Sequence, residues 1–185
     1  MKFLNFDYKD CTNPKDGYEI NRLDEKPINL KKLAYIEMIL NRKEYLKITT
    51  PIMVCLFGFN NRNNEICLQF TNHKTNKEMD DFYNFIEKME HIQMKYIGFG
   101  EDNCDLYNSQ IRQDKESKYD PYLVVKVPFR NNKYEVDVLN KENNYCSITN
   151  LYKFTRVKCD IYIDKIWKYN DRYICKWKVE KILLI

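Results

Sequence analysis

Glycine, alanine and histidine are scarce in this sequence of 185 residues. It contains four glycines, two histidines and a single alanine, Ala34. Phosphate-binding loops of the P-loop and dinucleotide types need several glycines within one short window. Gly58, Gly98 and Gly100 do not supply such a window. The scarcity of glycine therefore argues against the common nucleotide-binding enzymes.

Motifs for metal binding and catalysis are also lacking. The seven cysteines form no Cys-x-x-Cys pair, and their number is odd, whereas zinc sites and secreted disulfide frameworks use paired cysteines. Cys55, Cys67, Cys159 and Cys175 lie in apolar segments, so we interpret them as small buried side chains in a reducing compartment. No Gly-x-Ser-x-Gly or His-Glu-x-x-His motif is present. The sequence predicts no cofactor, no metal and no enzyme activity.

No apolar run approaches the roughly 18 residues of a membrane helix. The N-terminal segment, Met1 to Asp10, also lacks the apolar stretch of a signal peptide. We therefore expect an intracellular protein that does not bind membranes.

Positive charge is concentrated in the last third of the chain. Residues 118–185 contain 14 Lys and Arg against 8 Asp and Glu, a net charge of +6, whereas residues 1–117 contain 17 against 19, a net of −2. Such asymmetry suggests an anionic partner for the basic part. On charge alone, a lysine-rich solvated surface explains it equally well.

One amphipathic helix is predicted from Lys77 to Met94. Met79, Phe82, Ile86 and Met89 recur at three- and four-residue spacing, which is typical of one buried helix face. Thr75 and Glu78 have the spacing of an N-terminal capping box.

Strands are predicted before and after this helix. Residues 1–29 are interpreted as an irregular arm with one short strand, and residues 33–40 and 44–49 as a hairpin, although a helix also fits 33–40. The apolar runs 51–59 and 65–70 flank an Asn-rich loop and form a second expected hairpin.

The last 65 residues contain about five strand-like segments, so a small antiparallel barrel or sandwich is expected there. They are residues 123–130, 134–138, 145–151, 156–167 and 172–184, with turns at Asn131-Asn132 and Asn170-Asp171. The apolar end, Ile182 to Ile185, is expected to complete the last strand.

The segment from Ile166 to Lys178 alternates aromatic and basic residues and contains both tryptophans, Trp167 and Trp177. Binding of single-stranded nucleic acid without sequence preference needs cations along the phosphates and aromatic faces for the bases, each stacked base contributing about 1–3 kcal/mol. Alternation places Lys176 and Lys178 on one face and Trp177 on the other. Trp177 is therefore expected to pack in the core rather than to stack on bases, and the role of Trp167 is open.

Four segments resemble the single-stranded DNA-binding protein family of nucleocytoplasmic large DNA viruses, over about residues 44–185. They are Thr50 to Met53 with Phe57-Gly58-Phe59, Phe82 to Glu90, Tyr119 to Leu123 with Val125 to Pro128, and Ile166-Trp167 with Asn170 and Trp177-Lys178-Val179. The family tends to have glycine where this chain has Asp171 and Ile174, and glutamine where it has Lys181. These differences imply a different turn and a more covered strand face.

The resemblance implies a mainly β, α+β fold: an OB-fold-like antiparallel β-barrel with an N-terminal β extension and one packed helix, about 77–94. We expect a single domain over 1–185, with an irregular arm over 1–29 and the barrel with its helical insertion over 30–185.

The expected function is sequence-independent binding of single-stranded DNA in replication, recombination or repair. RNA remains an alternative ligand, and replication proteins and a second copy of the chain are further candidate partners. A viral protein of this family would act in the host cytoplasm. The candidate nucleic-acid-binding residues are Lys126, Arg130, Lys133, Tyr134, Lys153, Phe154, Arg156, Trp167, Lys168, Tyr169, Arg172, Tyr173, Lys176 and Lys178.

Two other functions remain open from the sequence. One is a structural or interaction protein of a viral replication complex or virion, without catalytic activity. The other is a nuclease that uses the acidic cluster of Glu101, Asp102 and Asp105, although a polar loop explains this cluster more simply.

Overall fold

The structure is a computed structural model. It describes residues 3–9, 21–27, 33–39, 45–114, 116, 119–169 and 171–185. The turn expected at 41–43, and Asn170 of the second expected turn, lie outside these residues.

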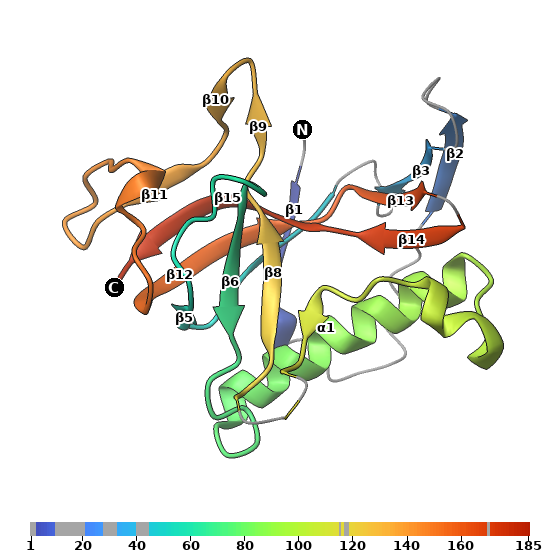
Figure 1. The fold of residues 1–185 in the computed structure, drawn as a ribbon, viewed down its shortest axis with the longest axis horizontal. Helices are drawn as coiled ribbons and strands as arrows, with labels where there is room; N and C mark the ends of the chain where they lie inside the picture. The colour runs from blue at the N-terminus through green and yellow to red at the C-terminus, as the bar shows by residue number, and fades with distance from the viewer. Residues whose placement is uncertain are drawn as a thin grey trace.

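Five strands close into a barrel (Figure 1). In chain order they are β5 (Met53–Cys55), β6 (Glu65–Gln69), β8 (Tyr122–Lys126), β12 (Thr155–Tyr162) and β15 (Trp177–Leu184). Around the barrel β12 pairs with β5, β5 with β6, β6 with β8, β8 with β15, and β15 with β12. Only β8–β15 among these pairs is parallel. This closed five-stranded arrangement is the expected OB-fold-like barrel.

The barrel encloses one apolar interior because its strands alternate buried and outward-facing residues. In β8, Leu123 and Val125 are fully buried, while Tyr122, Val124 and Lys126 between them are partly exposed. Since successive side chains point to opposite faces of a strand, the apolar half of each strand fills one interior. Burying apolar surface stabilises this core by roughly 25 cal/mol for each Å² removed from water.

Helix α1 (Lys77–Tyr96) packs along one end of the barrel, below it in Figure 1. Phe82, Ile86 and Met89 are buried, as the periodicity predicts. The predicted capping box is wrong: Asn76 is the N-cap, and its side chain accepts a hydrogen bond from the amide of Met79. Asn76 is nearer the first helical turn than Thr75, and asparagine is among the strongest N-cap residues.

Additional strands extend the barrel sheet. Strand β4 (Tyr45–Thr49) pairs with β12, and β1 (Phe3–Phe6) pairs in parallel with β4 behind the barrel. Strand β7 (Ile111–Arg112) pairs with β8, and β11 (Asp137–Leu139) pairs in parallel with β15. The N-terminal segment thus contains β1 as well as β2 (Asn21–Pro27), where one strand was expected.

A second, four-stranded antiparallel sheet has the order β14-β13-β3-β2. It joins β14 (Arg172–Cys175), β13 (Lys165–Tyr169) and β3 (Leu33–Ile39) to β2. The predicted hairpin of 33–40 with 44–49 is therefore wrong: both segments are strands, but β3 pairs with β13 and β4 pairs with β12. The expected long strands 156–167 and 172–184 are each divided, so that β13 and β14 leave the barrel.

Short elements complete the fold. The Asn131-Asn132 turn connects β9 (Phe129–Arg130) to β10 (Lys133–Tyr134), and both asparagines have positive φ angles of 50° and 60°, which type I′ hairpin turns require. Segment 145–151, expected as a strand, contains instead the 3₁₀ helix η3 (Ile148–Asn150). Another 3₁₀ helix, η2 (Glu101–Leu106), follows α1.

Cys55, Cys159 and Cys175 are free and buried, as expected, whereas Cys67 is a half-buried free thiol on the outward side of β6. None of the helices described here is both long and apolar enough to span a membrane.

Candidate nucleic-acid interface

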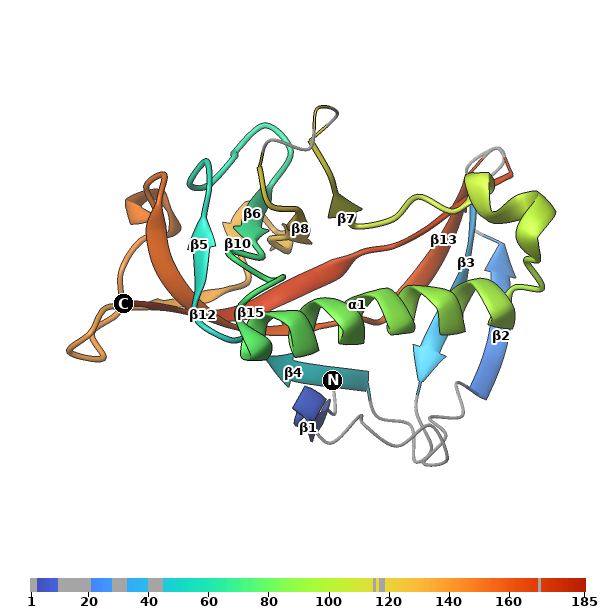
Figure 2. The same ribbon diagram turned by 90° about the horizontal axis from the view of Figure 1, so that it is seen from below.

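The outward face of β6 and β8 is not covered by α1 or by the N-terminal strand. Figure 1 shows α1 below the barrel and β1 behind it, and Figure 2 shows β6 and β8 on the opposite side of the molecule from β1 and β4. In OB-folds the face of the second and third barrel strands, with its flanking loops, binds oligonucleotides. Strands β6 and β8 are the second and third barrel strands along this chain. We call their outward side, with the neighbouring residues of β5, β7 and β12, the barrel face.

One row of side chains crosses the barrel face at right angles to the strands. The register pairs Arg156 with Val54, Val54 with Gln69, Gln69 with Tyr122, and Tyr122 with Arg112. All five are partly or fully exposed. Because adjacent strands lie about 4.8 Å apart, the two arginines are separated by roughly 19 Å along the sheet. The row presents an aromatic ring and an amide between two cations.

Exposed aromatic rings gather beside this row. Phe57 is 67% exposed, and its ring lies edge-on to that of Tyr122, with the ring centroids 6.2 Å apart. Tyr152 and Phe154 are also exposed, 69% and 65%. Large apolar rings at such exposure are available to a ligand, and aromatic faces are the usual platforms for unpaired bases.

The loop between β5 and β6 brings these rings together because it packs on the segment before β12. Gly58 has a φ of +72°, and a Cβ atom there would lie 2.6 Å from the carbonyl oxygen of Leu151. The amide of Phe59 donates to that carbonyl at 3.1 Å, and the amide of Phe154 donates to the carbonyl of Cys55 at 2.6 Å. Only glycine permits this approach, so Gly58 lets the loop that carries Phe57 pack against the segment that carries Tyr152 and Phe154.

The hydroxyl of Tyr122 is uncharged at neutral pH. Burial raises the pKa of its hydroxyl above the ordinary value of 10.0, with a smaller increase from Cys67, while the nearby charge of Arg112 lowers it. At neutral pH the ring is therefore an uncharged phenol. A neutral ring flanked by cations suits a ligand that alternates bases with phosphates.

The predicted binding residues fall into three groups that lie on different elements. The first group, at the end of β8 and on the β9–β10 hairpin and the start of β15, is Lys126, Arg130, Lys133, Tyr134, Lys176 and Lys178. The second, at the start of β12, is Lys153, Phe154 and Arg156. The third, on β13 and β14, is Trp167, Lys168, Tyr169, Arg172 and Tyr173. The second group adjoins the aromatic rings of the barrel face.

The third group belongs to the four-stranded sheet and not to the barrel. The Nζ of Lys168 lies 5.5 Å from the ring centroid of Tyr173 and 3.5 Å from Asp171, and the Nζ of Lys165 lies 5.8 Å from the ring centroid of Trp167. Each of these cation–π contacts occupies one face of its ring, as Lys153 also does on Phe154, with its Nζ 5.8 Å from the ring centroid. Tyr169, 57% exposed, is the most accessible ring of this group.

Trp177 is a core residue, as expected. It is 1% exposed, and its ring centroid is 6.4 Å from that of Phe85 on α1. The neighbouring Lys178 donates to the Oδ2 atom of Asp164 at 2.6 Å, and Asp164 is buried. Lys178 is thus paired with a carboxylate inside the protein.

The acidic segment considered for a nuclease forms η2, in which Asp102 and Asp105 are exposed. Over the described part of the chain, no three His, Cys, Asp or Glu side chains gather as a metal-binding group.

Comparison with solved structures gives a clear similarity of fold. The chain is similar to gp2.5, a single-stranded DNA-binding protein encoded by bacteriophage T7. The two share 10% sequence identity with a TM-score of 0.50, covering 76% of this chain and 86% of gp2.5. At 10% identity this similarity establishes the OB-like fold alone, and the function has to be inferred from the site.

The single-stranded DNA-binding protein of bacteriophage Enc34 aligns less closely. Its C-terminally truncated form has 13% identity and a TM-score of 0.47 over 88% of this chain and 95% of that one. Its complex with ssDNA has 11% identity and a TM-score of 0.49 over 89% and 94%. No protein-family model matches this chain, and no curated protein sequence matches it.

Sequence reasoning missed four residues of the barrel face: Arg112, Tyr122, Gln69 and Phe57. The signal for Tyr122 was present, because it alternates with the buried Leu123 and Val125 and shares a face with Lys126. Assigning β6 and β8 as the second and third barrel strands would have pointed to their outward residues. Arg112 had no such signal, since the two-residue strand β7 is too short to show a period.

Proposed function

We propose that this protein binds single-stranded DNA without sequence preference, along the barrel face. The observation that supports the proposal most directly is the row from Arg112 to Arg156, with Tyr122 between them and Phe57 beside it. The two arginines can bind phosphates of a single strand, and the two rings can stack on its bases whatever the sequence. The T7 protein with the same fold is itself a single-stranded DNA-binding protein.

The row also suggests the size of the binding site. A length of roughly 19 Å corresponds to about five or six stacked nucleotides at ~3.4 Å each. This lies within the range of about 4–16 nucleotides found for single OB-folds. We therefore expect oligonucleotides shorter than about five residues to bind weakly.

We further propose a non-catalytic role in DNA replication, recombination or repair, in which the protein covers exposed single strands. The motif resemblance favours a viral protein acting in the host cytoplasm, with replication proteins or a second copy of the chain as additional partners. RNA stays an alternative ligand, because phosphate and base stacking contacts do not distinguish it from DNA.

The test is titration with oligo-dT, followed by fluorescence anisotropy of a labelled oligonucleotide at two salt concentrations. Each phosphate contact on a single strand contributes about 0.7 to the slope of log affinity against log salt. Arg112→Gln and Arg156→Gln are each expected to reduce the slope by about that amount. Tyr122→Ala is expected to weaken binding by about 1–3 kcal/mol.

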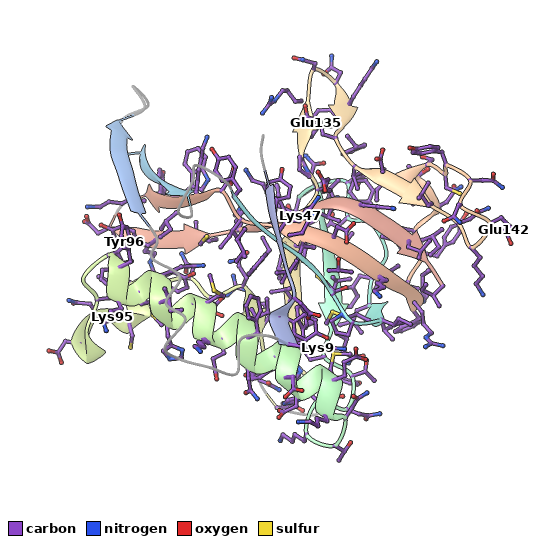
Figure 3. All side chains as sticks on the ribbon, turned by 180° about the vertical axis from the view of Figure 1, so that it is seen from behind. Lys9, Lys47, Lys95, Tyr96, Glu135 and Glu142 are labelled. Atoms are coloured by element: carbon purple, nitrogen blue, oxygen red, sulfur yellow. The ribbon has the colours of Figure 1, made fainter. Side chains whose placement is uncertain are left out.

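A matched control is Lys95→Gln, because Lys95 is exposed at the far end of α1 (Figure 3). This variant removes one positive charge without touching the barrel face, so its salt slope should equal that of the wild type. If the wild type fails to bind oligo-dT at low salt, the proposal is wrong. Capture of a defined protein partner in that case would favour the interaction-protein alternative.

A further inference from the structure

A cavity lies at the end of β8, where the chain leaves the barrel for the β9–β10 hairpin. Its volume is about 290 Å³. Its lining includes Asn64, Lys126, Phe129, Arg130, Glu135 and Lys178. We call this the hairpin cavity. It is close to the lower end of the volumes of ligand pockets, about 300 Å³, which suits a ligand the size of one nucleotide.

Aromatic packing holds the hairpin in place over this cavity. The ring of Tyr134 contacts those of Phe59 and Phe129, with centroids 4.9 Å and 4.8 Å away. Its hydroxyl donates to the Oδ1 atom of Asn64 at 3.3 Å, and the amide of Glu135 donates to the carbonyl of Pro128 at 2.8 Å. Tyr134 therefore anchors the hairpin to the β5–β6 loop, and the cavity exists before any ligand binds.

Phe129 is the most exposed of these three rings. It remains 47% exposed although it lines the cavity. Its free surface offers the kind of platform on which a base stacks, whereas the ring of Tyr134 already contacts two neighbours.

Charge in the cavity is unevenly compensated. The Nε of Arg130 lies 3.7 Å from a carboxylate oxygen of Glu135, and Lys178 is paired with Asp164. Lys126, in contrast, has no carboxylate within ion-pair distance in the described part of the structure, and its Nζ donates to the backbone carbonyl of Asn63. Burial lowers the pKa of Lys126 and the nearby charge of Lys176 lowers it further, while the smaller effect of Glu65, its partner across the β6–β8 pair, raises it. An anion at this position would relieve that repulsion.

We propose that the hairpin cavity binds one nucleotide of the single strand, with its phosphate on Lys126 and its base against the exposed ring of Phe129. The inference rests on the proposed function and adds a defined subsite to it. Lys126 lies four residues from Tyr122 on the same outward face of β8, or about 13 Å along the strand. The cavity therefore holds a nucleotide beyond the row that crosses the barrel.

The experiment compares Phe129→Ala and Lys126→Gln with the wild type on a series of dT oligonucleotides of increasing length. Loss of one stacked base is expected to weaken binding of Phe129→Ala to long oligonucleotides about 5- to 150-fold. Binding to the shortest oligonucleotides that fill only the row should not change. Lys126→Gln should reduce the salt slope on long oligonucleotides by about 0.7.

Matched controls are Tyr145→Ala and Lys141→Gln, which remove an exposed ring and an exposed cation from the segment after β11. Both should bind every oligonucleotide as the wild type does. Phe129→Tyr keeps the ring and should restore affinity, which separates stacking from a general loss of folding. Thermal melting of each variant checks that the fold is intact.

Wild-type affinity of Phe129→Ala and Lys126→Gln at all lengths would overturn the cavity proposal and leave single-strand binding by the barrel face intact. Weakening that is equal for short and long oligonucleotides would also overturn it, because the cavity would then not hold an additional nucleotide. If the wild type binds no oligonucleotide, both proposals fail together.

Discussion

We expect Lys178→Met to destabilise the fold far more than it weakens DNA binding. The side chain of Asp164 is 4% exposed, and its Oδ2 atom accepts from Lys178 at 2.6 Å. Its other oxygen, Oδ1, has no hydrogen-bond partner among the described residues. Removing the lysine would leave a buried carboxylate without its counter-charge, because no second ion pair to Asp164 is seen among the described residues.

Breaking a buried ion pair by removing one partner costs about 3–5 kcal/mol. The side chain of Lys178 is 22% exposed, so water can enter in its place, and we take the lower end, ~3 kcal/mol. For a protein of this size 1 kcal/mol shifts Tm by about 2–4 °C. The expected decrease is therefore about 6–12 °C.

Urea denaturation followed by circular dichroism measures the loss, and oligo-dT titration of the folded variant measures binding. The double variant Asp164→Asn with Lys178→Met removes both charges and should recover most of the stability. Lys158→Met, at an exposed position of β12, should change stability by less than about 0.5 kcal/mol. If Lys178→Met unfolds like the wild type but binds oligo-dT at least ~10-fold more weakly, the reasoning is refuted and Lys178 is a DNA contact.

Three further predictions concern residues that support the site. Trp177→Ala should lower stability to urea by about 3–5 kcal/mol, because it empties a core position, without changing the salt slope of DNA binding. Burial raises the pKa of Glu90, so the folded protein binds this proton more tightly than the unfolded chain, and stability falls as pH rises from the unfolded-state pKa through the folded-state pKa of Glu90. Glu90→Gln should remove this pH dependence, which is measured as the change in unfolding free energy between those two pKa values. Gly58→Ala should destabilise the fold by more than the ~1–2 kcal/mol cost of a left-handed residue, because the added Cβ would meet the Leu151 carbonyl. Gly98→Ala, at a φ of +81° with no atom within 4 Å of the added Cβ, should show only that conformational cost. Equal urea midpoints for the two variants would contradict this prediction.

Local patterns predict the elements that form from short-range interactions. The 3.6-residue period of Phe82, Ile86 and Met89 specifies α1, and the positive φ angles of Asn131 and Asn132 match their place in a two-residue turn. These features depend on neighbours within a few residues, so they can be predicted from the sequence alone.

Local sequence patterns do not indicate which strands pair with each other. Strand β3 pairs with β13, more than one hundred residues later, and an alternating sequence predicts a strand without indicating its neighbour. The same limit applies to the barrel face, whose row combines β12, β5, β6, β8 and β7. The basic and aromatic residues of segment 166–178 are contiguous in the sequence, yet they do not share one surface, because Trp177 is in the core.

Lys126 and Lys178 show why composition alone cannot assign a binding residue. They are register neighbours on the parallel pair β8–β15, and both point outward from the barrel. Yet the Nζ of Lys178 is held by the buried Asp164, whereas that of Lys126 donates to a backbone carbonyl beside the charge of Lys176. A phosphate gains more from Lys126, because there it need not compete with a buried carboxylate. In this barrel the availability of a cation for nucleic acid therefore depends on which carboxylate the fold places behind it.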